Sequence, residues 1–364
     1  MKLAVSLLHL RPGQVGGAET YVRELMAALP AAAAPDEVWA VMDRDLAASL
    51  ETPGARRVTV EVRARRVVAE RILEAVTPYR ARGMEEALAR LAPDAVLFPQ
   101  QSIFPRQVRA PAVLTVVDLQ HLYHPENIPL AERFFRAAAY GRSLARADRI
   151  IAISEFTART LEEQGCPREK VTAIPLGFTG SSRPEPANPV GGPYLYFPAA
   201  TFAHKNHELL FHTYAALRRL GAVRAKLVLT GLRTKRWPGL EKLARQLGIA
   251  GDVVHLGFVP YAEVRRLYAG AEAVLLPSGY EGFGLPAVEA ATLGCKVITS
   301  DLPAFAEVGV PDEDRIDFRQ PWQLRRALDR PGPTVLRKKP SSWMEVARKT
   351  VEVLRDAARS NGGR

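Results

Sequence analysis

Two glutamates and three glycines lie close together late in the chain, in an order that could hold a ligand. The segment reads Gly279-Tyr280-Glu281-Gly282-Phe283-Gly284-Leu285-Pro286-Ala287-Val288-Glu289. An apolar strand is predicted just before it, over residues 273–277, and a short helix just after it, because proline suits a first helical position. The backbone N–H groups of residues 282–285 would then gather at a helix N-terminus, a place that favours anions.

The two glutamates add hydrogen-bond acceptors to this anion-binding backbone. Glu289 lies one turn into the helix, and helical side chains lean toward the N-terminus, so its carboxylate can reach the same region. Carboxylates bind hydroxyls and backbone N–H groups bind phosphates, so a nucleotide-sugar fits the segment. The structural alternative is that Glu289 only complements the helix dipole and that Glu281 is a solvated loop acid.

The segment resembles the two-glutamate motif of family 4 glycosyltransferases. These enzymes have the GT-B fold and transfer a sugar from a nucleotide donor with retention of configuration. The resemblance extends from Gly16 to Trp343. It implies that Glu289 binds the donor ribose and that Glu281 binds hydroxyls of the transferred sugar. The amides of Gly282, Phe283, Gly284 and Leu285 would bind the diphosphate.

A cation is expected after the first strand of the second half. Lys205 follows that strand and resembles the phosphate-binding lysine of the family, which would stabilise the charge on the leaving diphosphate. Many relatives carry an arginine about five residues earlier, where this chain has Ala200. Arg233, Lys235 and Arg236 follow the next strand and are candidates for the second cation.

Two loops of the first half carry further candidates. Gly16 and Gly17 open the first helix, and they resemble the Gly-Gly-x-Glu turn of the family, whose amides meet a phosphate or the acceptor. Asp118 resembles the acid of a His-Asp pair that approaches the transferred sugar, but Val117 stands where relatives often carry histidine. His121 or His124 is then the candidate imidazole, with a structural role as the equal alternative.

The whole chain predicts two α/β domains. Its 364 residues exceed one ordinary core, and short apolar strands alternate with amphipathic helices from end to end. We expect two Rossmann-like domains facing each other across a cleft, the GT-B arrangement. The expected parts are an acceptor domain (1–178) joined by a C-terminal helix (343–364), a linker (179–193), and a nucleotide-sugar donor domain (194–342).

The C-terminal helix must pack on something, because an isolated helix of this length is marginal in water. Its apolar residues recur at three- and four-residue spacing: Trp343, Val346, Ala347, Thr350, Val351 and Leu354. We expect this stripe to dock on the first domain. The alternative is that it lies on an anionic membrane surface.

Charge is uneven along the chain. Residues 181–364 carry 27 Lys and Arg against 18 Asp and Glu, whereas residues 1–180 carry 23 against 21. A basic second half suits a diphosphate site, an anionic membrane surface or a nucleic acid. The first half has one basic run, interpreted as a solvated face or a contact with an anionic leaflet or acceptor: Arg56, Arg57, Arg63, Arg65, Arg66 and Arg71.

The sequence also indicates where the protein acts in the cell and whether it needs a metal ion. Two cysteines exclude a disulfide scaffold, and no apolar run reaches the length of a membrane-spanning helix. The start reads as a strand, so we expect a cytoplasmic protein, with peripheral contact at the inner membrane face left open. Asp43 and Asp45 have the spacing of a metal-binding acid pair, but no phosphate-binding feature follows them, and we expect no metal.

These observations favour a metal-independent, retaining hexosyltransferase that uses a nucleotide-diphosphate sugar. The sugar is expected to be of mannose type, and the acceptor a glycan, a lipid-linked molecule or a small molecule, as in polysaccharide biosynthesis. One alternative is a nucleotide-sugar epimerase of the same fold. The other is a basic nucleic-acid-binding protein, which the lack of interleaved aromatic and basic residues disfavours, so no nucleic-acid partner is expected.

Overall fold

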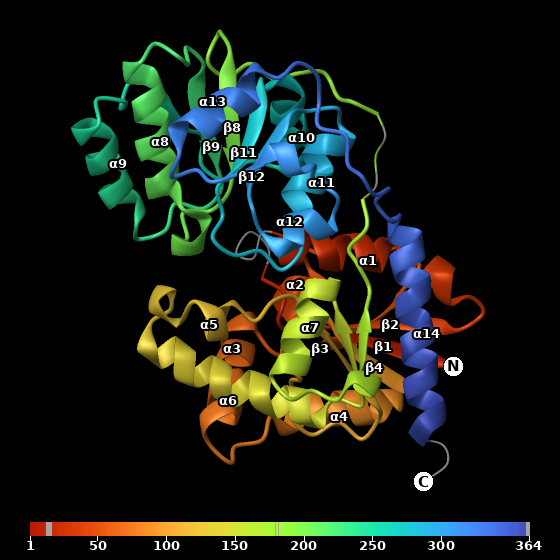
Figure 1. Ribbon diagram of the computed structural model, residues 1–364. Helices are drawn as coiled ribbons and strands as arrows, with labels where there is room; N and C mark the ends of the chain where they lie inside the picture. The colour runs from red at the N-terminus through yellow and green to blue at the C-terminus, as the bar shows by residue number, and fades with distance from the viewer. Residues whose placement is uncertain (12–16, 179, 181, 362–364) are drawn as a thin grey trace. The chain divides into compact units, whose positions relative to one another are not determined.

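The structure is a computed structural model of the chain and describes residues 1–11, 17–178, 180 and 182–361. The chain forms two compact units. Unit 1 comprises residues 1–177 together with 341–364, and unit 2 comprises residues 178–340. Each unit has one parallel sheet covered by helices, which confirms the predicted fold class of two Rossmann-like α/β domains (Figure 1).

In unit 1 the described strands pair in the order β3-β2-β1-β4-β5-β6-β7, every pair parallel. The strands are β1 (Lys2–Ser6), β2 (Glu37–Asp43), β3 (Arg56–Val60), β4 (Ala95–Phe98), β5 (Ala112–Val116), β6 (Arg149–Ala152) and β7 (Val171–Ala173). The α-helices are α1 (Gly17–Ala33), α2 (Arg44–Ala47), α3 (Ala64–Val76), α4 (Arg82–Leu91), α5 (Gln120–Tyr123), α6 (Leu130–Arg146), α7 (Glu155–Glu163) and α14 (Trp343–Asn361). Two short 3₁₀ helices, η1 (Pro125–Asn127) and η2 (Arg168–Lys170), complete the unit.

The strands of unit 1 form short apolar runs because both faces of the sheet are covered. On one face, Ala4 shares a core with Val67 of α3, Met84 of α4 and Leu161 of α7. Side chains alternate along a strand, so the buried Leu3 points to the opposite face. That face is covered by α1 and α14.

Helix α14 packs on α1 and on strands β4, β5 and β6, although it follows unit 2 in the sequence (Figure 1). Its apolar stripe is buried, with Trp343 4% exposed and Leu354 fully covered. Arg355 pairs with Asp36, just after α1, at 2.8 Å. The stripe is therefore part of the core of unit 1 and is not available to a membrane.

In unit 2 the described strands pair in the order β10-β9-β8-β11-β12-β13, again in parallel. The strands are β8 (Tyr194–Pro198), β9 (Lys226–Thr230), β10 (Val253–His255), β11 (Ala273–Leu276), β12 (Val297–Ser300) and β13 (Arg315–Ile316). The α-helices are α8 (His207–Arg219), α9 (Trp237–Gln246), α10 (Tyr261–Gly270), α11 (Leu285–Thr292), α12 (Pro303–Glu307) and α13 (Pro321–Asp329). The 3₁₀ helices are η3 (Ala203–Lys205) and η4 (Asp312–Asp314).

The stretch expected to be a linker, residues 179–193, packs on unit 2 over its described part. The backbone N–H of Ala187 donates to the carbonyl of Arg266 in α10 at 3.0 Å, and the hydroxyl of Tyr194 donates to the carbonyl of Ala187 at 2.9 Å. A proline-rich composition predicted an irregular chain. It did not predict that buried hydrogen-bond partners would attach this chain to α10.

Both sheets reverse their strand order once, between β1 and β4 in unit 1 and between β8 and β11 in unit 2. In open parallel sheets, ligands bind beyond the carboxyl ends of the strands at such a reversal, because the loops on either side diverge there. In unit 2 these are the loops that carry Lys205 and Glu281.

Candidate functional site

Lys205 and Glu281 meet at the strand-order reversal of unit 2. The Lys205 Nζ lies 2.6 Å from Glu281 Oε1, and the hydroxyl of Ser278 donates to the same oxygen at 2.7 Å. The side chains of Lys205 and Glu281 are only 20% and 12% exposed. The ion pair therefore holds a cation and an acceptor in fixed positions where a ligand of this fold would bind.

Backbone contacts fix the two loops against each other. The N–H of Gly279 donates to the carbonyl of His204 at 2.7 Å. Asn206 adopts a left-handed conformation with φ of 56°, and its side-chain amide donates to the carbonyl of Pro277 at 3.0 Å. Asparagine tolerates this conformation better than most residues, so the turn after Lys205 has a local cause in the sequence.

The loop after β11 ends in the N-terminus of α11, as the sequence predicts. Gly284 has φ of 93° and is the N-cap of the helix, and Pro286 follows in the first turn. A Cβ at Gly284 would lie 2.9 Å from the ring of Phe305. Only glycine fits there. Pro286 has no N–H, and the N–H groups of Ala287 and Val288 donate to the carbonyl of Gly284 at 2.9 and 3.4 Å, so the positive end of α11 acts mainly through its dipole.

Glu289 is buried inside unit 2, only 5% exposed. Its carboxylate accepts hydrogen bonds from the hydroxyls of Tyr261 at 2.8 Å and Tyr268 at 3.2 Å. Burial, and next the charge of Glu289, raise the pKa of Tyr268 well above its ordinary value, so this hydroxyl stays a donor. A carboxylate has about four acceptor positions, and the two tyrosines occupy two of them and orient Glu289.

The two tyrosines are the part of this site that the sequence did not identify. Tyr261 begins α10 and Tyr268 lies two turns later on the same helix, whereas Glu289 lies on α11. No spacing rule links residues on separate helices. The sequence carried no signal that would have joined them to Glu289.

Arg233 and Lys235 do not contact the ion pair of Lys205 and Glu281. The guanidinium of Arg233 donates to the carbonyl of His255 at 2.7 Å and lies 5.0 Å from the ring of Trp237. Lys235 is exposed. In the part of the chain that the structure describes, neither residue has a hydrogen bond or ion pair with Lys205 or Glu281, so neither supplies the second cation in this conformation.

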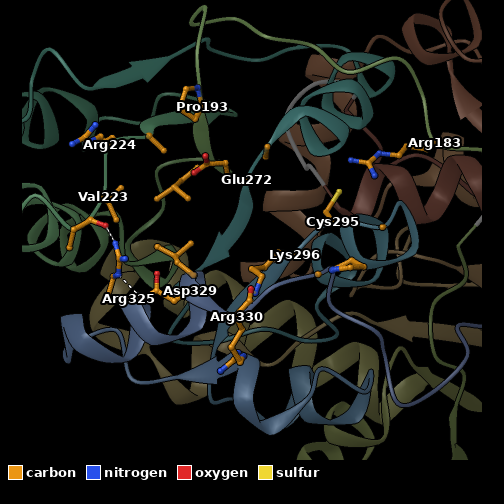
Figure 2. A pocket seen from close by; sticks show the side chains of 18 residues that line it. Arg183, Pro193, Val223, Arg224, Glu272, Cys295, Lys296, Arg325, Asp329 and Arg330 are labelled. Atoms are coloured by element: carbon orange, nitrogen blue, oxygen red, sulfur yellow. Dashed lines mark hydrogen bonds and ion pairs between the residues drawn. The ribbon is translucent and has the colours of Figure 1, made fainter.

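A cavity of about 480 Å³ lies at the opposite, amino ends of β8, β11 and β12 (Figure 2). Its lining is basic, and several of the cations have protein partners. Arg325 pairs with Asp329 at 2.7 Å (Figure 2). Lys296 donates to main-chain carbonyls, including that of Ala327 at 3.0 Å. This cavity is therefore a structural ion-pair region, separated from Lys205 and Glu281 by the length of the strands.

In unit 1, Asp118 and His121 follow β5, as the sequence predicts. Gln101 clamps this turn, because its side-chain oxygen accepts from the N–H of Val117 at 2.7 Å and its amide donates to the carbonyl of Asp118 at 2.9 Å. Asp118 Oδ1 accepts from the N–H of Gln120 at 3.1 Å. The Asp118 side chain thus contributes to the local turn.

His121 is buried with its ring edge against Tyr140, 5.1 Å between centroids. Burial lowers the pKa of His121 to about 4, and the charge of Arg136 acts in the same direction. The imidazole is therefore neutral near pH 7. His124 lies at 3.1 Å from Glu126 and is more exposed.

The structure describes only part of the glycine turn before α1. Gly17 is the first residue of α1, and a Cβ there would meet nothing within 4 Å. Gly16 lies outside the described residues. The available space at Gly17 is compatible with a ligand or with solvent.

The acid pair Asp43 and Asp45 has structural partners. Asp43 caps α2 by accepting from the N–H of Leu46 at 2.9 Å and pairs with Arg11 at 2.9 Å, while Asp45 accepts from the N–H of Ala64 at 2.8 Å. Over the described ranges, no group of three His, Cys, Asp or Glu side chains could hold a metal ion. No helix within these ranges is long and apolar enough to cross a membrane.

The two units match two family descriptions that follow each other along the chain. Residues 16–177 match the glycosyl transferase 4-like domain, and residues 179–329 match glycosyl transferases group 1. Together these matches span most of the chain. It therefore belongs to the glycosyltransferases built from this pair of domains, which confirms the resemblance to family 4 enzymes.

Relatives and solved structures agree with this assignment. The chain is 28% identical to O-antigen chain mannosyltransferase B of Escherichia coli, over 65% of this chain and 63% of that protein. It is 30% identical to the MMP alpha-(1->4)-mannosyltransferase of Mycolicibacterium hassiacum, over 63% and 59%. The matched region thus spans about six-tenths of these relatives. Anabaena HepE, solved with UDP and glucose, shares the GT-B fold with a TM-score of 0.63 and 17% identity over both full chains.

Proposed function

We propose that this protein transfers a hexose from a nucleotide-diphosphate sugar to a glycan, lipid-linked or small-molecule acceptor, with retention of configuration. The observation that carries the proposal is the ion pair of Lys205 and Glu281 at the strand-order reversal of unit 2. A cation, an acceptor and a helix N-terminus match the three chemical parts of such a donor.

The diphosphate would bind at Lys205 and at the positive N-terminal end of α11. Breaking the glycosidic bond puts negative charge on the leaving diphosphate and positive charge on the sugar. Donors fixed before the reaction stabilise such charge without reorganisation. Because Lys205 and α11 supply this positive potential, a divalent cation is not required, and we propose a metal-independent reaction.

The two glutamates would bind hydroxyls at either side of the diphosphate. Glu281 would accept from the transferred sugar and Glu289 from the ribose, with Tyr261 and Tyr268 orienting Glu289. Among the described residues no side chain is an evident general base, and the leaving phosphate would take the proton of the acceptor on the same face of the sugar. That same-face route is what retention of configuration requires.

The donor sugar is proposed to be of mannose type. Support comes from the names of two relatives, both mannosyltransferases, and the solved neighbour with UDP and glucose supports a nucleotide-sugar as the donor. We further propose a cytoplasmic site of action with peripheral contact to the membrane when the acceptor is lipid-linked.

Thermal shift with a panel of nucleotide-sugars tests the donor. A ligand at 100 times its dissociation constant stabilises by about 2.7 kcal/mol, and we expect one mannose nucleotide to give the largest shift. The stabilising donor is then incubated with and without acceptors. Transfer only with an acceptor supports the proposal, whereas conversion of the sugar without any acceptor identifies an epimerase.

The metal-independence is tested in the same assay. We expect the transfer rate to stay unchanged in saturating EDTA, because Lys205 and α11 replace the cation. A rate that collapses with chelator and returns with magnesium or manganese contradicts this part of the proposal.

A further inference from the structure

A cavity of about 170 Å³ lies within unit 1 between α3, α6 and the loop after β4. This volume holds several waters, each of which occupies about 30 Å³ in the liquid. Apolar side chains such as Ile103 and Phe104 form part of the wall. The charged lining consists of four arginines and one acid: Arg71, Arg106, Arg142, Arg146 and Glu74.

Three of these arginines have protein partners. Arg106 donates to the carbonyls of residues 78 and 79 at 3.2 and 3.1 Å, and Arg142 donates to the carbonyls of residues 74 and 75 in the last turn of α3. Arg146 donates to a carbonyl and lies 3.2 Å from Asp148. Their hydrogen bonds are satisfied, but most acceptors are neutral carbonyls, so the cavity stays positively charged.

Glu74 offsets only one of these charges. Its two carboxylate oxygens accept from the backbone N–H groups of Ala81 at 2.7 Å and Arg106 at 2.8 Å. Burial raises the pKa of Glu74, whereas these two hydrogen bonds act in the opposite direction. The acid holds the loop in place and is not directed at Arg71.

Arg71 is the exception among the four. Within the described ranges it has no ion pair, and its buried Nε has no hydrogen-bond partner. It lies 5.2 Å from the ring of Phe135. Burial lowers the pKa of Arg71, and the charges of Arg11 and Arg136 act in the same direction, whereas Tyr140 opposes them. A half-buried cation whose covered Nε lies among like charges costs free energy unless an anion accompanies it.

We propose that this cavity binds the oxyanion of a small ligand, a phosphate or carboxylate group, with the guanidinium of Arg71 as its partner. Guanidinium groups match such oxyanions with two parallel hydrogen bonds. The apolar wall would contact the carbon part of the ligand. This site lies wholly inside unit 1 and does not depend on the transfer reaction.

Inorganic phosphate is the first probe, compared with sodium chloride at equal ionic strength. Hydrogen exchange locates the effect: phosphate should protect residues 64–76 and 102–106. We expect Arg71→Gln to abolish this protection and to melt no lower than the wild type without phosphate, because it removes an unpaired cation. Arg65→Gln is the matched control, since Arg65 lies exposed on the same helix, and it should keep the full response.

Arg71→Lys separates charge from geometry. It keeps the cation but loses the two-fold hydrogen bond, so protection should be weaker than in the wild type. Equal protection by phosphate in the wild type and in Arg71→Gln overturns the proposal. So does an Arg71→Gln protein that is destabilised equally with and without phosphate, because that result assigns Arg71 a packing role on Phe135. The transfer assay then identifies the source of the oxyanion. If phosphate raises the acceptor KM, the site binds an oxyanion group of the acceptor. If phosphate changes only kcat, the site binds a separate effector.

Discussion

The carboxyl edges of the two sheets have the same topology and different chemistry. In unit 2 the loops at the reversal carry opposite charges, Lys205 and Glu281, which pair with each other. In unit 1 the loop after β1 carries His9, which is half-buried, stacks on Phe104 and lies close to Gln100 and Ser102 after β4. Burial lowers the pKa of His9 well below its ordinary value, so this imidazole is neutral, whereas the ion pair of the same loop joins Arg11 to Asp43 at the end of β2.

This difference shows how one strand order serves two kinds of ligand. The reversal decides where a ligand can bind, because the loops diverge there in both units. The side chains in those loops decide which part of a substrate fits. A fixed ion pair beside a helix N-terminus suits a charged leaving group. A neutral imidazole suits an uncharged group that must bind weakly enough to leave.

The units also differ in whether one continuous stretch of chain forms them. The prediction with the largest expected effect tests this difference. Unit 2 is one stretch of chain, whereas unit 1 needs α14 from the far end. Burying a large apolar side chain contributes about 1.5–3 kcal/mol, and α14 buries Trp343, Val346, Val351 and Leu354. Deleting 343–364 should therefore remove most of the stability of unit 1, since a domain has only about 5–15 kcal/mol in total.

Hydrogen exchange of the truncated protein measures this unit by unit. Strands of unit 1 should lose protection while those of unit 2 keep theirs. Lys349→Ala, on the exposed face of α14, is the control and should leave both units protected. A truncated protein with unchanged protection in β4 and β5 would show that α14 is dispensable.

Neutral variants of Lys205 and Glu281 test the role of this ion pair in the transfer reaction. Lys205→Met and Glu281→Gln should each lower kcat by about a hundredfold or more, because one lost preorganised charge-stabilising group costs about 3 kcal/mol in the transition state. The double variant should lose less than the product of the two effects, since the residues contact each other. Glu241→Gln, exposed on α9, is the control, and independent losses in the double variant would argue against a shared site.

A smaller effect is expected at Glu289. Ribose contacts change little during the reaction, so Glu289→Gln should raise the donor KM by roughly tenfold and leave kcat near its original value. Tyr261→Phe removes one hydrogen bond to Glu289 and should give a weaker form of the same change. Variants that lower kcat alone would place Glu289 at the reacting bond and not at the ribose.

The smallest effect concerns pH. Burial lowers the pKa of His207 to about 3 and that of His255 to about 4, below the ordinary value of about 6.5. The unfolded chain then binds more protons between these values, so stability is full above pH 6.5 and falls as the pH drops toward 4. His207→Leu should make this slope shallower by up to about 1.4 kcal/mol per pH unit.

His212 provides the matched control for that measurement. It lies on α8 with His207 but is exposed, so His212→Leu should leave the slope of the unfolding free energy against pH unchanged. Identical slopes in the wild type and His207→Leu would show that His207 is not neutral in the fold.

The strands were largely predictable because they are local features. The sequence predicted a strand over residues 273–277, and the structure has β11 at Ala273–Leu276. Apolar runs bounded by turn residues have few other solutions when both faces of a sheet are buried. The glycine turn into α11 was predictable for the same reason, since Gly284 and Pro286 each restrict the backbone.

Helix α3 was not predicted, and its pattern explains the failure. Val68, Ile72 and Val76 are exposed, whereas Glu70 and Glu74 are buried. This reverses the usual relation between polarity and burial on which periodicity arguments depend. The arginine run was interpreted as a solvated face or an anion contact, and the structure places one of its members, Arg71, at the wall of a cavity.

By itself the sequence determined the kinds of element and the chemistry of the loops: a glycine-rich helix start, two acids and a lysine. Only the tertiary structure decided which of these residues meet. Lys205 and Glu281 are 76 residues apart and become partners because β8 and β11 are neighbours in the sheet. Arg233, closer in sequence to Lys205, lies instead against His255. Strand order is set by packing the whole sheet, and no local pattern contains that information.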